Sequence, residues 1–103
     1  MTSEHIKDAM RILLPSLVEC LGGDERNVLL TLARMLYTAT TGRFTSKDQA
    51  AAWAKSLLSK ADADLLSYAR LAYWGEVLDD WTDRGSQAVY LTDELTRRLS
   101  ALL

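Results

Sequence analysis

The feature that most constrains the fold is a long amphipathic segment between residues 24 and 42. Its apolar residues recur at steps of three and four, the spacing of one helix face: Val28, Leu29, Leu32, Met35, Leu36 and Ala39. Asp24 follows a pair of glycines and suits an N-cap, where its carboxylate can accept from amides of the first turn. Gly42 suits a left-handed C-cap. The sequence therefore predicts a helix between these two residues.

A second helix is predicted directly after the first, opening at Ser46. Ser46 and Gln49 have the spacing of a capping box. Its buried side is expected to use Ala50, Ala51, Trp53, Ala54, Leu57 and Leu58. Because few residues separate the two helices, they are predicted to form a central antiparallel helical hairpin.

Helices are also predicted on both sides of this hairpin. In the helix predicted before the hairpin, Pro15 predicts a break or kink. Residues 16–21 are then predicted to form a separate short helical piece. Another helix covers residues 62–74 and stops at Gly75, and a last one covers residues 87–102. The last helix is expected to bury Val89, Tyr90, Leu95, Leu99 and Leu102. Residues 76–83 are left without an assignment.

No segment alternates polar and apolar residues as a strand does, so no sheet is predicted. The fold class is all-α, an irregular bundle of about five or six helices in a single domain over residues 1–103.

Composition excludes several classes of function. The net charge of −2 and the pI near 5.3 argue against a nucleic-acid-binding protein. One cysteine, Cys20, excludes an internal disulfide, and with only His5 there is no set of soft metal ligands. No apolar run reaches the ~18 residues of a membrane span, and no signal peptide opens the chain. A cytoplasmic location is predicted.

The sequence contains no self-sufficient active site. The acids of Asp62-Ala63-Asp64 lie at a predicted helix start, where they suit the helix dipole, and residues two apart on a helix diverge. Asp79-Asp80 is interpreted as a solvated loop. The three tryptophans, at positions 53, 74 and 81, are interpreted as core residues. No catalytic residue and no metal ligand is predicted in this chain.

Two basic residues and one acid remain as candidates for binding. Lys47 falls in the first turn of its predicted helix, where the dipole opposes a cation. Folding that helix back brings Lys47 within reach of the region of Arg34, and the pair would suit a phosphate group. Alternatively, Arg34 pairs with an acid and Lys47 is a plain surface residue. Asp24 has a structural role as N-cap, yet a free oxygen could accept from a cationic ligand.

The segment GDERNVLLTLARMLYTATTGRFTSKDQAAAWA resembles the C-terminal helical domain of the aminoglycoside adenylyltransferases that modify streptomycin and spectinomycin. DERN, LTLAR, TG, KD and AAxWA follow one another in the family's order and spacing. ARLAYWG at residues 69–75 is similar to a later helix end of the family, and the clear match covers about half of the chain.

This resemblance implies a two-domain enzyme that transfers AMP from ATP to a drug hydroxyl at the domain interface. Arg34 and Lys47 match residues that contact the ATP phosphates, and Asp24 matches an acid that recognises the drug. The family's Trp and Asp just upstream are missing from PSLVECL, residues 15–21, where Glu19 is the nearest acid that could replace them.

The family's catalytic nucleotidyltransferase domain is not present in this sequence, so the polypeptide is expected to be inactive alone. ATP and magnesium are expected only together with that domain, supplied by a separate subunit or segment. An exposed apolar face could instead form a homodimer. The alternative functions are a non-enzymatic helical interaction module and a degraded remnant of such an enzyme. A DNA-reading helix-turn-helix is disfavoured by the acidic balance.

Overall fold

The computed structural model describes residues 3–103 as a bundle of five α-helices with one short 3₁₀ turn. The elements are α1 (Ser3–Glu19), α2 (Glu25–Thr41), α3 (Lys47–Ala54), η1 (Lys55–Leu57), α4 (Lys60–Tyr73) and α5 (Gly85–Ser100). No strand occurs in residues 3–103, which confirms the predicted all-α class. Within the same residues, no helix has the length and apolar character needed to cross a membrane.

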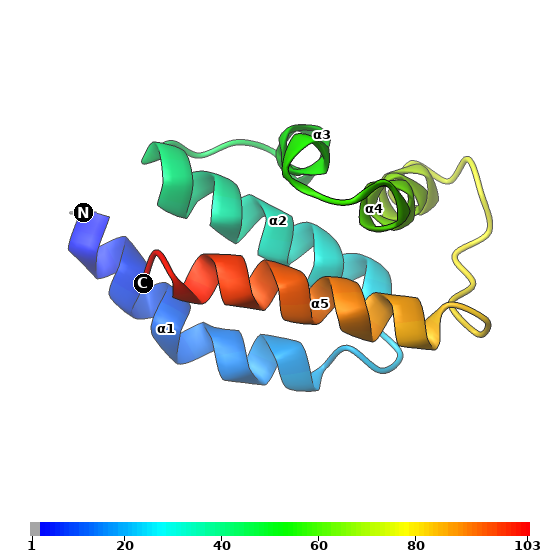
Figure 1. Ribbon diagram of the computed structural model, residues 1–103, viewed down its shortest axis with the longest axis horizontal. Coiled ribbons are helices and arrows are strands. Elements are labelled where there is room, and N and C mark those ends of the chain that lie inside the picture. The colour runs from blue at the N-terminus through cyan, green and yellow to red at the C-terminus, as the bar shows by residue number, and fades with distance from the viewer. Residues whose placement is uncertain (1–2) are drawn as a thin grey trace.

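The helices are arranged around α2. Figure 1 shows α1 and α5 on one side of α2 and α3 and α4 on the other. α2 and α3 are packed neighbours, as predicted, but α3 is seen nearly end on and so crosses α2 steeply instead of running antiparallel to it. The small buried side chains Ala50, Ala51 and Ala54 permit this close crossing.

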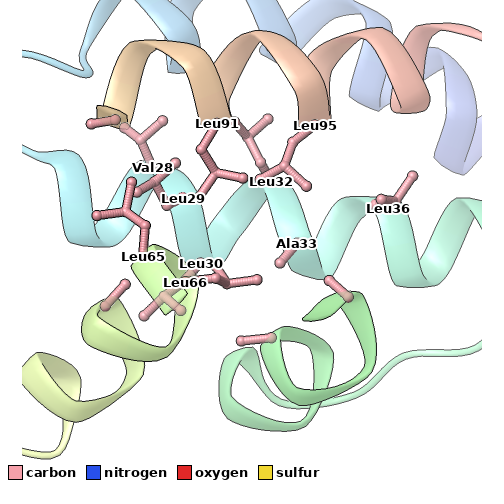
Figure 2. Close-up of a cluster of buried hydrophobic side chains, with 14 of the residues drawn as sticks. Val28, Leu29, Leu30, Leu32, Ala33, Leu36, Leu65, Leu66, Leu91 and Leu95 are labelled. Carbon is pink, nitrogen blue, oxygen red and sulfur yellow. The ribbon is translucent and has the colours of Figure 1, made fainter. Parts of the chain in front are cut away.

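The core is built on α2, which is buried on more than one face. Its buried apolar residues are Val28, Leu29, Leu30, Leu32, Ala33 and Leu36. Leu30 and Ala33 lie outside the predicted stripe, and they are buried because α3 and α4 cover the side of α2 opposite α5 (Figure 2). Leu66 of α4 lies next to Leu30, and Leu91 of α5 packs on the other side. Each fully buried leucine contributes about 2 kcal/mol of transfer free energy.

The helix ends follow the sequence signals with one correction. Gly42 has φ 73°, and its amide donates to the carbonyl of Thr38 at 2.8 Å, as expected for a left-handed C-cap. The hydroxyl of Ser46 accepts from the amide of Gln49 at 3.1 Å. Asp24 occupies the N-cap position of α2, but its carboxylate makes no capping bond. With φ −139° and ψ 31°, its backbone lacks the extended conformation that is typical of an N-cap residue.

Of the break or kink predicted at Pro15, the break does not occur, because α1 continues through Pro15 to Glu19. Proline removes the amide that would bond to the carbonyl of Arg11. Pro15 is exposed, so water can satisfy that carbonyl. Arg11 also donates from Nε to the carbonyl of Leu103 at 3.1 Å, which ties α1 to the segment that follows α5.

The register of α5 also differs from the prediction. Val89 and Tyr90 are 49% and 72% exposed, and the buried residues are Ala88, Leu91, Thr92, Leu95 and Leu99. This second stripe follows helix spacing more closely, and it faces α2. At the end of the α3 region, Leu57 is likewise exposed rather than buried.

The segment between α4 and α5, which the sequence left unassigned, is an ordered loop held by Tyr68. The Tyr68 hydroxyl accepts from the amide of Asp80 at 3.0 Å and shares its proton between the carbonyls of Leu78 and Asp80. The buried ring of Trp81 packs edge to face on Tyr68, with 5.1 Å between centroids, and Arg84 covers Tyr68 with its guanidinium group 4.0 Å from the ring centroid. Trp53 is partly buried and Trp74 is exposed, so the core assignment holds fully for Trp81 alone among the three tryptophans.

Candidate functional site

Arg34 and Lys47 line one open groove of about 650 Å³ between α1, α2 and the start of α3. We call it the basic groove, and its lining residues are Ile6, Ala9, Met10, Leu13, Leu17, Asn27, Thr31, Arg34, Met35, Thr38, Phe44 and Lys47. Among residues 3–103, these two cations are the only charged residues that line it. The structure thus brings together the two basic residues that the sequence singled out.

The two cations differ in how they are held. Arg34 is exposed on α2 and forms no ion pair within residues 3–103. Lys47 is half-buried, and its Nζ donates to Oδ1 of Asn27 at 2.7 Å. The alternative in which Arg34 is neutralised by an acid is therefore not supported. Both cations have donors left for an anionic ligand, because a guanidinium group carries five N–H donors and an ammonium group three.

Asp24 lines a second groove, of about 500 Å³, near the N-terminal end of α2. We call it the acidic groove, and its lining residues are Gly23, Asp24, Glu25, Arg26, Asp79, Asp80, Trp81, Thr82 and Gly85. Four of these residues are acids and one is basic. Half of the groove comes from the loop before α5, far from Asp24 in sequence.

The acids of the loop are fixed by local contacts. Oδ2 of Asp79 lies 3.2 Å from the guanidinium group of Arg26, and its Oδ1 accepts from Nε1 of Trp81 at 2.7 Å. Hydrogen bonds from Thr82 lower the pKa of Asp80, helped by the nearby charge of Arg84. Both loop carboxylates are therefore held in place, and Asp80 remains charged over a wider pH range.

Asn27 joins the two grooves, and sequence reasoning did not select it. Its Nδ2 donates to Oδ2 of Asp24 at 3.1 Å, while its Oδ1 accepts from Lys47. The spacing of three residues from Asp24 was the available signal, since residues three apart share a helix face. The contact with Lys47 could not be read from the sequence because it depends on how α3 crosses α2.

Glu19 is not brought to either groove. It is exposed in the last turn of α1 and is not a lining residue of the acidic or the basic groove. The structure therefore does not place Glu19 in the groove that Asp24 lines.

With this geometry in place, the comparison with known proteins decides the family. Residues 1–98 match the model of the aminoglycoside adenylyltransferase C-terminal domain. The chain belongs to that family. Within the family, spectinomycin 9-adenylyltransferase of Staphylococcus aureus strain Mu50 is 55% identical over 76 residues, which are 74% of this chain and 29% of the relative.

Two further relatives extend the match. Spectinomycin 9-adenylyltransferase of Campylobacter jejuni is 41% identical over 99 residues, 96% of this chain and 38% of the relative. Aminoglycoside (3'') (9) adenylyltransferase of Escherichia coli is 40% identical over 79 residues, 73% of this chain and 30% of the relative. This adenylyltransferase C-terminal domain therefore spans roughly a third of the length of the relatives that it matches.

A solved structure confirms the fold of the family domain. The crystal structure of spectinomycin adenyltransferase AAD(9) from Enterococcus faecialis with ATP and spectinomycin superposes with a TM-score of 0.84 at 26% identity. The superposition covers 92% of this chain and 37% of the enterococcal chain.

Magnesium does not fit the residues described here. No group of three or more His, Cys, Asp and Glu side chains in residues 3–103 is arranged to hold a metal ion.

Proposed function

We propose that this chain is the substrate-binding helical domain of an adenylyltransferase that transfers AMP from ATP to a hydroxyl group of spectinomycin or streptomycin. The observation that carries the proposal is the placement of Arg34 and Lys47 in one groove that no acidic residue of the described part of the chain lines. In this proposal the basic groove binds ATP phosphates and the acidic groove binds the cationic drug. The chemical step itself needs a catalytic domain that this segment does not supply.

The basic groove has the chemistry that phosphate binding requires. Charge-assisted hydrogen bonds from Arg34 and Lys47 would orient the phosphate oxygens. Lys47 is placed in the first turn of α3, whose amides add a positive dipole end to the same region. Two cations and a helix N-terminus would hold the leaving phosphates in a fixed position, and positioning of this kind accounts for much of the catalysis of phosphoryl and nucleotidyl transfer.

The acidic groove supports binding of a cationic drug through Asp24. One of its carboxylate oxygens accepts from Asn27, and the other remains available to an ammonium or guanidinium group. Asp79 and Asp80 add negative potential from the facing loop. Glu19 receives no support from its position, so we retain Asp24 as the drug-binding acid.

The proposed partner is a nucleotidyltransferase domain or subunit, which would work with this domain in the cytoplasm. Exposed apolar side chains beside the basic groove, Leu13 and Phe44, are suited to contact such a partner and to exclude water from the phosphates. A second copy of the chain is the alternative occupant of this surface. Light scattering at high protein concentration distinguishes a homodimer of the chain from a monomer that lacks the catalytic partner.

The experiment that tests the proposal is a chimaera in which this chain replaces the matched segment of the Staphylococcus aureus relative. We expect the chimaera to adenylylate spectinomycin and the isolated chain to be inactive. In the chimaera, Arg34→Ala and Lys47→Ala should each raise the KM for ATP about tenfold or more.

Lys60→Ala is the matched control. Lys60 also follows a serine N-cap, Ser59, in the first position of its helix, but it lies outside the basic groove. An equal loss with Lys60→Ala would contradict the assignment of Lys47. A chimaera that folds and remains inactive would favour the non-enzymatic interaction module instead.

A further inference from the structure

The side chain of Asn27 is held between a carboxylate and an ammonium group. Its Nδ2 donates to Oδ2 of Asp24 at 3.1 Å, and its Oδ1 accepts from Nζ of Lys47 at 2.7 Å. An amide nitrogen only donates and an amide oxygen only accepts, so both bonds form in one orientation of the side chain. The two charged neighbours therefore fix Asn27.

This contact crosses from one groove to the other. Asp24 lines the acidic groove, whereas Asn27 and Lys47 line the basic groove. Asp24 and Asn27 come from the start of α2, and Lys47 comes from the start of α3. The bond between Asn27 and Lys47 is partly buried, so it is screened less than a surface contact.

The ammonium group of Lys47 keeps its charge uncompensated in this arrangement. Within residues 3–103 Lys47 forms no ion pair, and its one hydrogen bond goes to the neutral Asn27. A direct bond to a carboxylate would neutralise the cation and compete with any anion for it. A neutral amide attracts the ammonium group through its dipole alone.

We infer that Asn27 is a positioning residue, which holds Lys47 close to Asp24 while keeping the two charges from neutralising each other. The inference deepens the proposed function and rests on it. It explains how a phosphate-binding lysine and a drug-binding carboxylate can both bond to the side-chain amide of Asn27. Each group retains a full charge for its own ligand. Neither Lys47 nor Asp24 would need to break an ion pair before binding its ligand.

The first test measures the bridge without any ligand. The exchange of Lys47 Nζ protons with water is measured by nitrogen-15 NMR in the wild-type chain and in Asn27→Ala, with Lys60 as the reference lysine in the same sample. We expect exchange at Lys47 to become at least about threefold faster in Asn27→Ala, since a hydrogen bond to a charged group is lost. Unchanged exchange at Lys47 would overturn the inference.

The second test measures the consequence of a charge at position 27. Tripolyphosphate binding is followed by calorimetry at low salt for the wild-type chain, Asn27→Asp and Gln49→Glu. Asn27→Asp keeps the shape of the side chain but places a carboxylate against Lys47, and we expect affinity to fall about tenfold or more. Gln49→Glu adds the same charge at an exposed position of α3, and we expect a loss of about twofold.

The outcomes separate the inference from the proposed function. Equal losses in Asn27→Asp and Gln49→Glu, with both variants folded by circular dichroism, would show a long-range charge effect and overturn the role of Asn27. If the wild-type chain binds no tripolyphosphate, the proposed phosphate-binding role of Lys47 fails. The exchange measurement then decides by itself whether Asn27 holds Lys47.

Discussion

Arg70 of α4 and Asp48 of α3 form a largely buried ion pair, with 2.9 Å between Nε and Oδ1. Their side chains are only 20% and 24% exposed. The guanidinium group of Arg70 also lies 5.1 Å from the ring centroid of Trp74. One arginine therefore fixes the position of α3, and with it the start of the helix that carries Lys47.

Removal of this pair should loosen the contact between α3 and α4. We expect Arg70→Met to lower the free energy of unfolding by about 2 kcal/mol, because Asp48 is left partly buried without its partner and the stacking on Trp74 is lost. A double-mutant cycle with Asp48→Asn, measured by urea unfolding, should give a coupling of about 1 kcal/mol. Arg43→Met, at an exposed arginine that forms no ion pair within residues 3–103, is the control and should change stability little. Additive effects of Arg70→Met and Asp48→Asn would contradict a direct interaction.

A buried hydroxyl group in α5 offers a stabilising substitution. Thr92 is 1% exposed, and its Oγ1 has no hydrogen-bond partner among the described residues. Thr92→Val keeps the shape and removes an unsatisfied polar group, so we expect the free energy of unfolding to rise by about 1 kcal/mol. Thermal and urea unfolding measure this change, with the exposed Thr40→Val as a control. A loss of stability in Thr92→Val would mean that the hydroxyl finds a partner in solution.

The hydroxyl of Tyr68 should control the order of the loop before α5. Because the amide of Asp80 donates to this oxygen at 3.0 Å, Tyr68→Phe should speed hydrogen exchange at that amide. For each hydrogen bond of the Tyr68 hydroxyl that is removed, we expect the free energy of unfolding to fall by about 1 kcal/mol. Tyr90→Phe changes an exposed tyrosine in the same way and should leave exchange at Asp80 as it is. If Asp80 keeps its protection in Tyr68→Phe, other contacts hold the loop.

Glu94 should make stability depend on pH in a known direction. Hydrogen bonds from Arg97 and Arg98 lower the pKa of Glu94 below its ordinary value of 4.5. A lowered folded pKa means that the stabilisation is present above pH 4.5 and is lost as the pH falls through the folded value. Urea unfolding should therefore show Glu94→Gln less stable than the wild type at pH 7, with the difference shrinking in acid. Glu76→Gln, in the exposed loop, is the control. A difference that grows in acid would reverse the assigned sign.

The sequence predicted the fold best where local signals agree. Gly42 marks the end of α2 because a left-handed C-cap depends on adjacent residues, and Asp24 marks its start although its carboxylate makes no capping bond. In α5 the apolar residues Val89 and Tyr90 were wrongly predicted to be buried. Ala88 and Thr92 are less hydrophobic, and yet they belong to the buried stripe. A stripe of small residues is recognised only when the facing helix is known.

For the candidate site, the sequence predicted that Arg34 and Lys47 lie near one another, and both line the basic groove, although the antiparallel packing on which that prediction relied does not occur. The acidic groove was not predictable, because Asp79 lines it together with Asp24 from a loop without periodicity some 50 residues later. The steep crossing of α3 depends on which faces of two helices bury alanine, and hydrophobic spacing alone does not set a crossing angle.

The bond from Arg11 to the carbonyl of Leu103 also has a topological consequence. It places the first helix beside the last residue, and Figure 1 shows the two ends of the ribbon on the same side of the molecule. A circular permutant that joins these ends by a short linker and opens at the exposed Gly22-Gly23 turn would keep the contacts among its helices. In that molecule α1 would follow α5 in the sequence. The packing around α2 would then be independent of the order of the helices along the chain.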